Sequence, residues 1–163
     1  MRVIDQEYLR SIIFGIEDSL VSTTGLLVGL GVGADDKRIV ILGGTVAIAI
    51  EAVSMGAGEY LSDDAVQELD KLKRHRDKPL ISGSFMLISY LLAGLIPLAP
   101  IIFLNFPYSL YYSVAFALGG LFLLGYAKGK VLHTSPWRGA FKILIVGGLA
   151  TALGVLVGAL FQI

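Results

Sequence analysis

Four acidic residues interrupt long apolar stretches of the sequence and are the first candidates for chemistry. Glu17, Asp18, Glu51 and Glu59 all lie within such stretches. A charge in hydrocarbon costs at least about 2.5–3.5 kcal/mol on insertion scales, so such a residue normally faces a cavity, a partner or an ion path. Counting about 1.5 Å per helical residue places Asp18 and Glu51 each about 12 Å from the same membrane surface. We therefore expect these two carboxylates to lie at one level.

Met55 lies between two of these acids. Glu51, Met55 and Glu59 recur at four-residue intervals, which places them along one face of a helix. Carboxylates suit Mg²⁺, Ca²⁺ or Mn²⁺, and a thioether adds a preference for softer first-row transition metals. A lone methionine more often packs in a core, but the position between two acids favours a ligand. Protonatable carboxylates can also exchange protons for metal, which is the chemistry that an antiporter needs.

The elements that carry these residues are five apolar runs. The chain has 163 residues, of which 55% are hydrophobic and 16% charged, with a mean hydropathy of +0.77. A soluble domain has roughly 45–50% apolar and about 25% charged residues. Each run is long enough to cross about 30 Å of hydrocarbon as a helix, and none alternates like a barrel strand. We predict an all-α polytopic membrane protein, a single transmembrane domain over residues 1–163, with spans at about 9–33, 39–61, 80–104, 108–126 and 139–161. The second helix is expected to extend into the cytoplasm to about residue 72.

Basic residues are distributed unevenly between the two sides that five spans define. Only Lys37 and Arg38 fall on one side, and the other eleven Lys and Arg residues fall on the opposite side. The positive-inside rule therefore predicts a cytoplasmic N-terminus and an external C-terminus. The predicted location is the cytoplasmic membrane of a prokaryote.

Several function classes are disfavoured by composition. Thirteen basic and thirteen acidic residues cancel, so net charge gives no attraction to nucleic acid. The chain has no cysteine, which excludes disulfides and thiolate metal sites. No nucleophile–base pair or redox ligand set is visible in the sequence, so we expect neither an enzyme nor a resident cofactor.

Glycines suggest close helix packing. Gly25, Gly29 and Gly33 follow one another at four-residue spacing in the first predicted helix. In the second, Gly56 and Gly58 lie beside Met55. Small residues at this spacing let membrane helices approach closely and often dimerise. Five helices enclose a path poorly, so we expect a homodimer with the ion route near its symmetry axis.

Two segments resemble the signatures of a known family. Residues 14–24 read FGIEDSLVSTT, similar to FGxxDGxxST, and residues 54–62 read SMGAGEYLS, similar to SMxxGEYxS. Both are motifs of the vacuolar iron transporter family, whose members export cytosolic Fe²⁺ or Mn²⁺ into a vacuole or out of a cell. The resemblance implies proton-coupled transport by a dimer, with Asp18 and Met55 as metal ligands within the membrane. It also implies a correspondence between Glu7 and an acid that precedes the first helix in the family.

The sequence departs from the family pattern in two places. Ser19 stands where the motif has glycine. Vacuolar members also carry a Glu-rich cytoplasmic domain that gathers metal between helices two and three. Here only 18 residues join Leu61 to Leu80, and they are as basic as they are acidic. The resemblance is therefore to a minimal member that lacks the cytoplasmic metal-binding domain.

The leading hypothesis is a metal/proton antiporter that exports Fe²⁺ or Mn²⁺ from the cytoplasm. Asp18 and Met55 would bind the ion, Glu51 would ligate it or carry the proton, and Glu59 would act at the cytoplasmic mouth. Co²⁺ and Zn²⁺ accept similar ligands, so the sequence does not rank them against iron. Besides the ion and protons, the expected partners are membrane lipid and a second copy of the chain.

Two alternatives remain open. A proton-coupled exporter of organic cations would use the same acids, while Met55 only packs. A non-transporting assembly subunit would pair its glycine faces and acids with a basic helix of another protein.

Overall fold

Five long helices make up nearly all of the described chain. The computed structural model describes residues 3–69 and 78–162. Its helices are α1 (Val3–Ala34), α2 (Lys37–Leu69), α3 (Pro79–Phe103), α4 (Tyr108–Val131) and α5 (Pro136–Leu160), with no strand in the described ranges. All five are long and apolar enough to cross a membrane. The predicted all-α class with five membrane helices is confirmed.

The helices extend beyond the predicted spans, mainly at one end of the molecule. α1 begins at Val3 rather than near residue 9, and α4 continues to Val131 rather than 126. Hydropathy marks the part of a helix that lies in hydrocarbon, whereas backbone hydrogen bonding continues into the polar interface. α2 continues past its apolar run to Leu69. The expected last turn, to about residue 72, lies outside the described residues.

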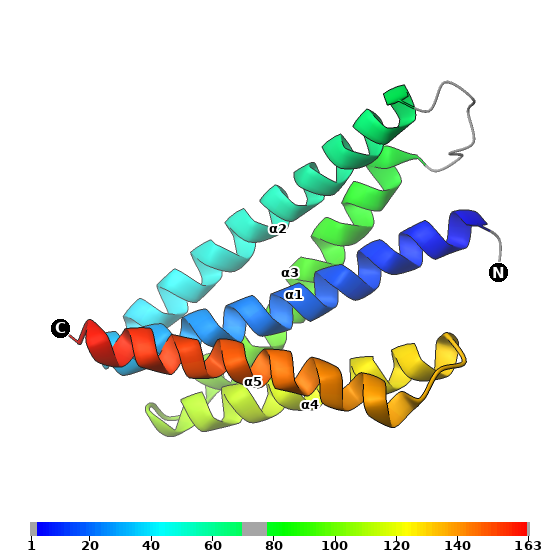
Figure 1. The fold of residues 1–163 in the computed structure, drawn as a ribbon. Helices are drawn as coiled ribbons and strands as arrows, with labels where there is room; N and C mark the ends of the chain where they lie inside the picture. The colour runs from blue at the N-terminus through cyan, green and yellow to red at the C-terminus, as the bar shows by residue number, and fades with distance from the viewer. Residues whose placement is uncertain (1–2, 70–77, 163) are drawn as a thin grey trace.

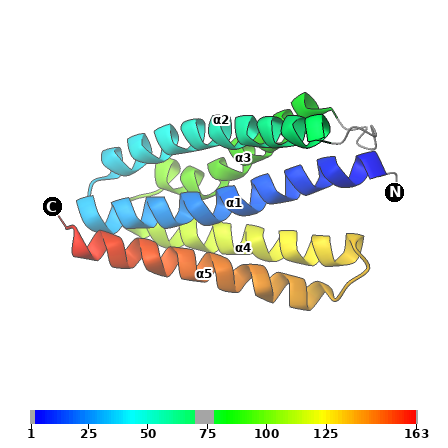
Figure 2. The same ribbon diagram turned by 45° about the horizontal axis from the view of Figure 1, so that its top comes forward.

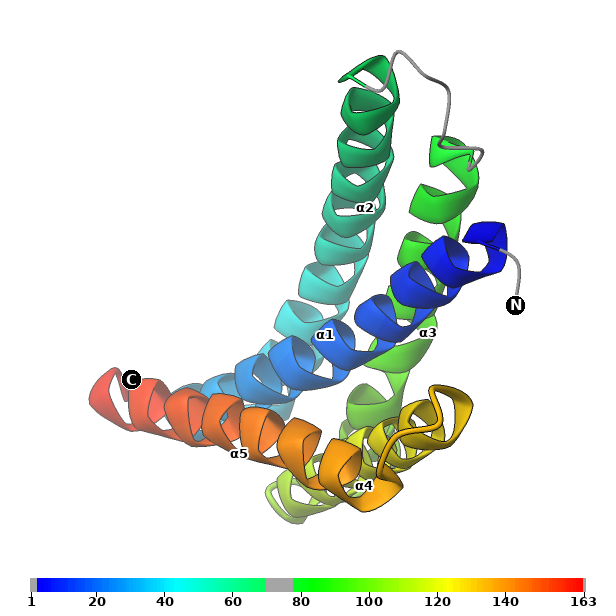
Figure 3. The same cartoon turned by 45° about the vertical axis from the view of Figure 1, so that its right-hand side comes forward.

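α1 lies between two helix pairs. α2 packs on α3, α4 packs on α5, and α1 contacts all four of these helices. Figure 1 shows the two pairs, and in Figure 3 the α2–α3 pair runs in a different direction from the α4–α5 pair, with α1 between them. Within the described residues α2 and α5 make no contact with each other. α1 therefore packs on both pairs, which also meet directly where α4 contacts α3.

Two apolar clusters pack around α1. Leu20 is buried against residues of α3, α4 and α5, and Leu27 is buried against residues of α2 and α3. Both leucines are almost completely inaccessible to solvent. The two leucines lie two turns apart on α1, and α3 takes part in both clusters.

The glycines at four-residue spacing on α1, Gly25, Gly29 and Gly33, pack within the chain against α5. A Cβ added at Gly25 would lie 3.0 Å from the carbonyl oxygen of Ala150, and one at Gly29 would lie 3.0 Å from that of Gly154. A Cβ at Gly154 would in turn overlap the carbonyl oxygen of Gly25. The backbones of α1 and α5 thus meet directly, as small-residue faces allow. A stripe of small residues accepts any complementary helix, and the matching stripe on α5, Ala150, Gly154 and Gly158, follows the same four-residue spacing.

The two ends of the bundle differ in how many basic residues they hold. The start of α1, the end of α2, the start of α3 and the α4–α5 connection lie at one end, opposite the C-terminus, as Figure 2 shows. Lys78 precedes α3 at this end, Lys128 and Lys130 lie in the last turn of α4, and Arg138 lies in the first turn of α5. We call this the basic end, and the opposite one the far end. The fold thus gathers basic residues that are distant in sequence.

Lys37 has a structural role at the far end. Its Nζ donates hydrogen bonds to the carbonyl oxygens of Ile102 at 3.1 Å and Leu104 at 2.9 Å, where α3 ends. The last carbonyls of a helix have no partner within the helix, so a lysine supplies one.

We expect Lys37→Met to destabilise the protein by about 1 kcal/mol, because both hydrogen bonds are lost. The midpoint of thermal unfolding in detergent should then fall by about 2–4 °C. Arg38→Met is the matched control, since the Arg38 side chain makes no hydrogen bond or ion pair with the described residues. Equal effects of the two substitutions would contradict this role for Lys37.

Candidate functional site

Glu51 of α2 is hydrogen-bonded to both neighbouring helices in the middle of the bundle. Its Oε2 accepts a hydrogen bond from Ser22 Oγ of α1 at 3.2 Å and another from the Tyr90 hydroxyl of α3. Ser22 Oγ and the Tyr90 hydroxyl are themselves 2.6 Å apart. Tyr90 is completely buried, and a buried phenol normally requires such a partner. These three residues, which we call the Glu51 cluster, join three helices through one carboxylate oxygen.

Asp18 lies one turn before Ser22 on α1 and is half-buried. Its carboxylate is near enough to those of Glu51 and Glu17 for their negative charges to repel it. Asp18 makes no hydrogen bond or ion pair with any side chain that the structure describes. The fold therefore places the two acids near each other, and Asp18 has no cationic partner among the described side chains.

Met55 lies between two contacts that α2 makes with α1. Glu51 reaches Ser22, whereas Glu59, two turns further along α2, accepts a hydrogen bond from Ser11. Because the two helices run antiparallel, Met55 lies level with about residues 15–18 of α1. The Met55 side chain is half-buried. The helix register thus places Met55 and Asp18 at one level of the bundle.

Glu59 lies at the basic end within a network of ion pairs. Its Oε1 accepts a hydrogen bond from Ser11 Oγ at 2.6 Å and pairs with Arg10 Nη2 at 3.0 Å. The same arginine lies 3.6 Å from Glu7 and 3.8 Å from Asp63. Glu7 and Glu59, both singled out from the sequence, are therefore in one cluster, and Arg10 holds it together.

Glu17 is paired on the other side of α1. Its Oε2 lies 3.8 Å from Lys128 Nζ of α4. The side chains are 26% and 39% exposed respectively, so water reaches both groups. This pair compensates the charge of Glu17, in contrast to neighbouring Asp18.

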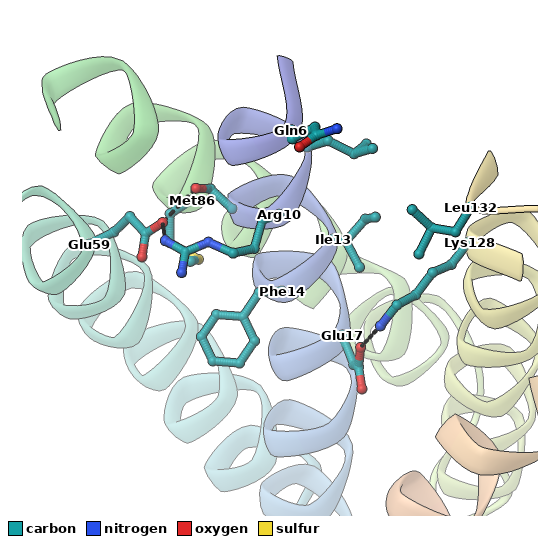
Figure 4. Close-up of a pocket in the computed structure, with 11 residues that line it drawn as sticks. Gln6, Arg10, Ile13, Phe14, Glu17, Glu59, Met86, Lys128 and Leu132 are labelled. Carbon is teal, nitrogen blue, oxygen red and sulfur yellow. Dashed lines mark hydrogen bonds and ion pairs between the residues drawn. The ribbon is translucent and has the colours of Figure 1, made fainter. Parts of the chain in front are cut away.

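A cleft of about 710 Å³ opens over α1 at the basic end. Figure 4 shows its walls, with Glu59 of α2 on one side of α1 and Lys128 of α4 on the other. The remaining wall is mostly apolar and includes Phe14 and the buried Met86. The cleft thus connects the Glu59 network with the Glu17–Lys128 pair.

One chain offers an incomplete set of metal ligands. No group of three or more His, Cys, Asp or Glu side chains within residues 3–69 and 78–162 could hold a metal ion. Asp18, Glu51 and Met55 supply two carboxylates and one thioether, whereas transition metals commonly take four to six ligands. A complete coordination shell therefore needs water, backbone oxygens or residues of a second copy.

Sequence reasoning did not identify five side chains that contact or flank the candidate residues. They are Arg10, Ser22, Met86, Tyr90 and Lys128. Tyr90 could have been identified from the sequence, because a tyrosine hydroxyl in the middle of an apolar run needs a hydrogen-bond partner when it is buried. Arg10 and Lys128 had been counted only as topology-setting charges, and their partners depend on how the helices are rotated.

Comparisons with known proteins agree on one family. A sequence model of the VIT family matches two overlapping segments, residues 9–77 and 64–159. "Vacuolar iron transporter 1" of Arabidopsis thaliana is 25% identical over 209 residues, which cover 90% of this chain and 83% of the relative. "Vacuolar iron transporter homolog 1" of the same plant is 26% identical over 160 residues, covering 90% of this chain and 80% of the relative. The 209-residue alignment is longer than this chain, so the first relative contains inserted segments that this chain lacks.

Proposed function

This chain belongs to the VIT family, and on that premise we propose that it transports divalent transition-metal ions, Fe²⁺ or Mn²⁺, across a membrane. Relatives that align over 90% of this chain are named iron transporters. The observation that carries the proposal is the position of Asp18 one turn from Ser22, whose hydroxyl donates a hydrogen bond to Glu51, with Met55 at the same level of the helix register. Two carboxylates and a thioether suit a first-row transition metal, and Co²⁺ or Zn²⁺ would find the same ligands.

The path that we propose begins at the basic end. Glu59 lies at the mouth, Met55 follows one turn deeper on α2, and Glu51 follows one turn beyond Met55. Each of the three is half-buried, while their neighbours Ser54 and Gly58 are exposed. A metal ion would thus meet a ligand at each turn of α2, with Asp18 facing the inner part of this route from α1.

Proton coupling follows from the same two acids. When both are ionised, Asp18 and Glu51 repel each other. A divalent cation relieves this repulsion, and so do protons, which makes metal and proton binding mutually exclusive. The hydroxyls of Ser22 and Tyr90 hold Glu51 in place in either state, because each can donate to or accept from it.

We further propose that the basic end faces the cytoplasm and that the protein works as a homodimer. The positive-inside rule supports the orientation, which makes the transport an export from the cytoplasm and fits a prokaryotic cytoplasmic membrane. The incomplete ligand set within one chain supports the dimer, because a two-fold axis beside α1 and α2 would double the ligands. The exposed Val46, Ile50 and Val53 form an apolar stripe on α2 for this interface.

Transport in proteoliposomes tests the function. We expect Asp18→Asn and Met55→Leu each to lower Fe²⁺ or Mn²⁺ flux at least about tenfold, since even indirect ligand partners are worth that much. A metal-sensitive dye and a pH probe inside the vesicles would report both fluxes at once.

Asp35→Asn is the matched control, because Asp35 is an exposed acid beyond the end of α1. It should stay within about twofold of the unsubstituted protein. Full metal transport by both site variants would contradict the proposal. Proton uptake driven by organic cations, with Met55→Leu unaffected, would favour a drug exporter instead.

A further inference from the structure

Three carboxylates surround one guanidinium at the mouth of the proposed path. Arg10 of α1 lies 3.0 Å from Glu59 and 3.8 Å from Asp63, both of α2, and 3.6 Å from Glu7 of α1. All three distances are within ion-pair range. A single cation, Arg10, is therefore shared by all three carboxylates.

Arg10 covers Glu59 from the water side. The Arg10 side chain is 61% exposed, whereas that of Glu59 is only 12% exposed. Both contacts of Glu59, with Arg10 and with Ser11, involve Oε1, and Oε2 has no partner among the described residues. A metal ion bound at Oε2 would therefore lie close to the guanidinium on Oε1 of the same carboxylate, and the two positive charges would repel each other.

The charge of Arg10 is permanent, and its contribution to folding is small. An arginine in a protein does not lose its proton, so it cannot yield its place by titration. Ion pairs of an exposed side chain add little to stability because solvent screens them. Arg10 thus changes the binding free energy of a cation at the mouth more than it changes the free energy of unfolding.

The opposite wall of the cleft repeats this arrangement. Glu17 is paired with Lys128, and Figure 4 shows the two ion pairs flanking α1 on either side. The two carboxylates that line the cleft, Glu17 and Glu59, are therefore each neutralised by a base of this chain. A vestibule that simply concentrated cations would leave such carboxylates unpaired.

We propose that Arg10 is a tethered counter-ion that competes with the transported metal for Glu59 and so sets the metal concentration at which loading begins. This rests on the proposed transport function and adds a specificity-determining residue to it. An exporter with such a competitor stays idle at low metal concentration and works when metal is abundant. Arg10 acts through Glu59, and it does not itself bind the ion.

Steady-state transport by Arg10 variants tests this role. In proteoliposomes with the basic end facing the metal solution, we expect Arg10→Gln to lower the KM for Mn²⁺ by about threefold to tenfold. This range corresponds to removing one positive charge a few ångströms from a divalent ion at a screened surface. The maximal rate should change by less than about twofold, because the inner ligands are untouched. Arg10→Lys keeps the charge and should keep the original KM.

Arg138→Gln is the matched control, because it removes an exposed arginine at the same end that makes no ion pair within the described chain. It should leave the KM unchanged. An unchanged or higher KM for Arg10→Gln would overturn the proposal, and so would equal effects of the glutamine and lysine variants. If Arg10→Gln and Arg10→Ala both fail to yield folded protein while Arg10→Lys folds, Arg10 is structural and the proposal is wrong. Absence of metal flux in the unsubstituted protein would instead contradict the transport function itself.

Discussion

Gly154→Ala is expected to destabilise the protein, because a single methyl group at this position has no space. A Cβ on Gly154 would overlap the carbonyl oxygen of Gly25 on α1, and the backbone of Gly25 cannot move without shifting the whole helix. Overpacking of this kind costs about 1–3 kcal/mol. For a chain of this size the midpoint of thermal unfolding should fall by roughly 2–4 °C per kcal/mol.

Gly148→Ala, on the same helix α5, is a control that we expect not to lower the stability of the protein. A Cβ at Gly148 has no neighbour within 4 Å. Alanine is a better helix former than glycine by about 1 kcal/mol, so Gly148→Ala should leave stability unchanged or raise it. The contrast between the two variants isolates close backbone packing from helix propensity.

Substitutions at Gly25 and Gly154 together distinguish packing within the chain from dimerisation. If the glycine face of α1 held two copies together, Gly154→Ala on α5 would leave thermal stability unchanged. A variant at Gly25 would then dissociate the dimer without unfolding either chain. We instead expect Gly25→Ile and Gly154→Ala both to lower the unfolding midpoint, since the two residues are in contact. Size-exclusion chromatography with light scattering would report the oligomeric state in each case.

The positions of the helices in the sequence were predictable because the bilayer restricts them. About 20 apolar residues are needed for each crossing, and all five such runs became helices. The constant rise of a helix also let residue counts predict one level for Asp18 and Glu51, and in the structure Ser22, one turn after Asp18, donates a hydrogen bond to Glu51. These predictions depend only on properties along one helix axis.

The pairing of helices was not predictable in the same way. Gly25, Gly29 and Gly33 specify a smooth face, but a smooth face fits α5 and a second copy equally well. The partners of Glu51 and Glu59 depend on how each helix is rotated and on which rotamer its side chains adopt. Tyr90 and Arg10 therefore entered the site only with the structure, although the acids that they contact were identified from the sequence.

Glu51→Gln is expected to uncouple metal movement from proton movement. The substitution keeps the shape of the side chain and removes the group that we propose to bind a proton when no metal is present. Glutamine can still accept a hydrogen bond from Ser22 and Tyr90 through its amide oxygen, so the contacts between α1, α2 and α3 persist. We expect metal-driven proton flux to fall at least about tenfold, because a titratable group inside the membrane has been lost.

The pH dependence of transport gives the sharper measurement. Carboxylates bind metal in the deprotonated form, so the apparent affinity of the unsubstituted protein for Mn²⁺ should fall as pH falls. Glu51→Gln should flatten this dependence, while Asp18 retains part of it. Glu68→Gln, an exposed acid near the end of the same helix, should retain the full dependence. An unaltered pH profile in Glu51→Gln would contradict a proton role for Glu51.

Tyr90→Phe separates the role of the carboxylate from that of its support. The phenylalanine keeps the ring in its buried place and removes the hydroxyl, so Glu51 retains only Ser22 among the hydrogen-bond partners that the structure describes. Loss of one such bond is worth about 1 kcal/mol, which predicts a roughly fivefold loss of transport. The ratio of protons to metal ions should stay the same, because the Glu51 carboxylate is retained. A changed ratio in Tyr90→Phe would assign the proton to the tyrosine–glutamate pair as a unit instead of to Glu51 alone.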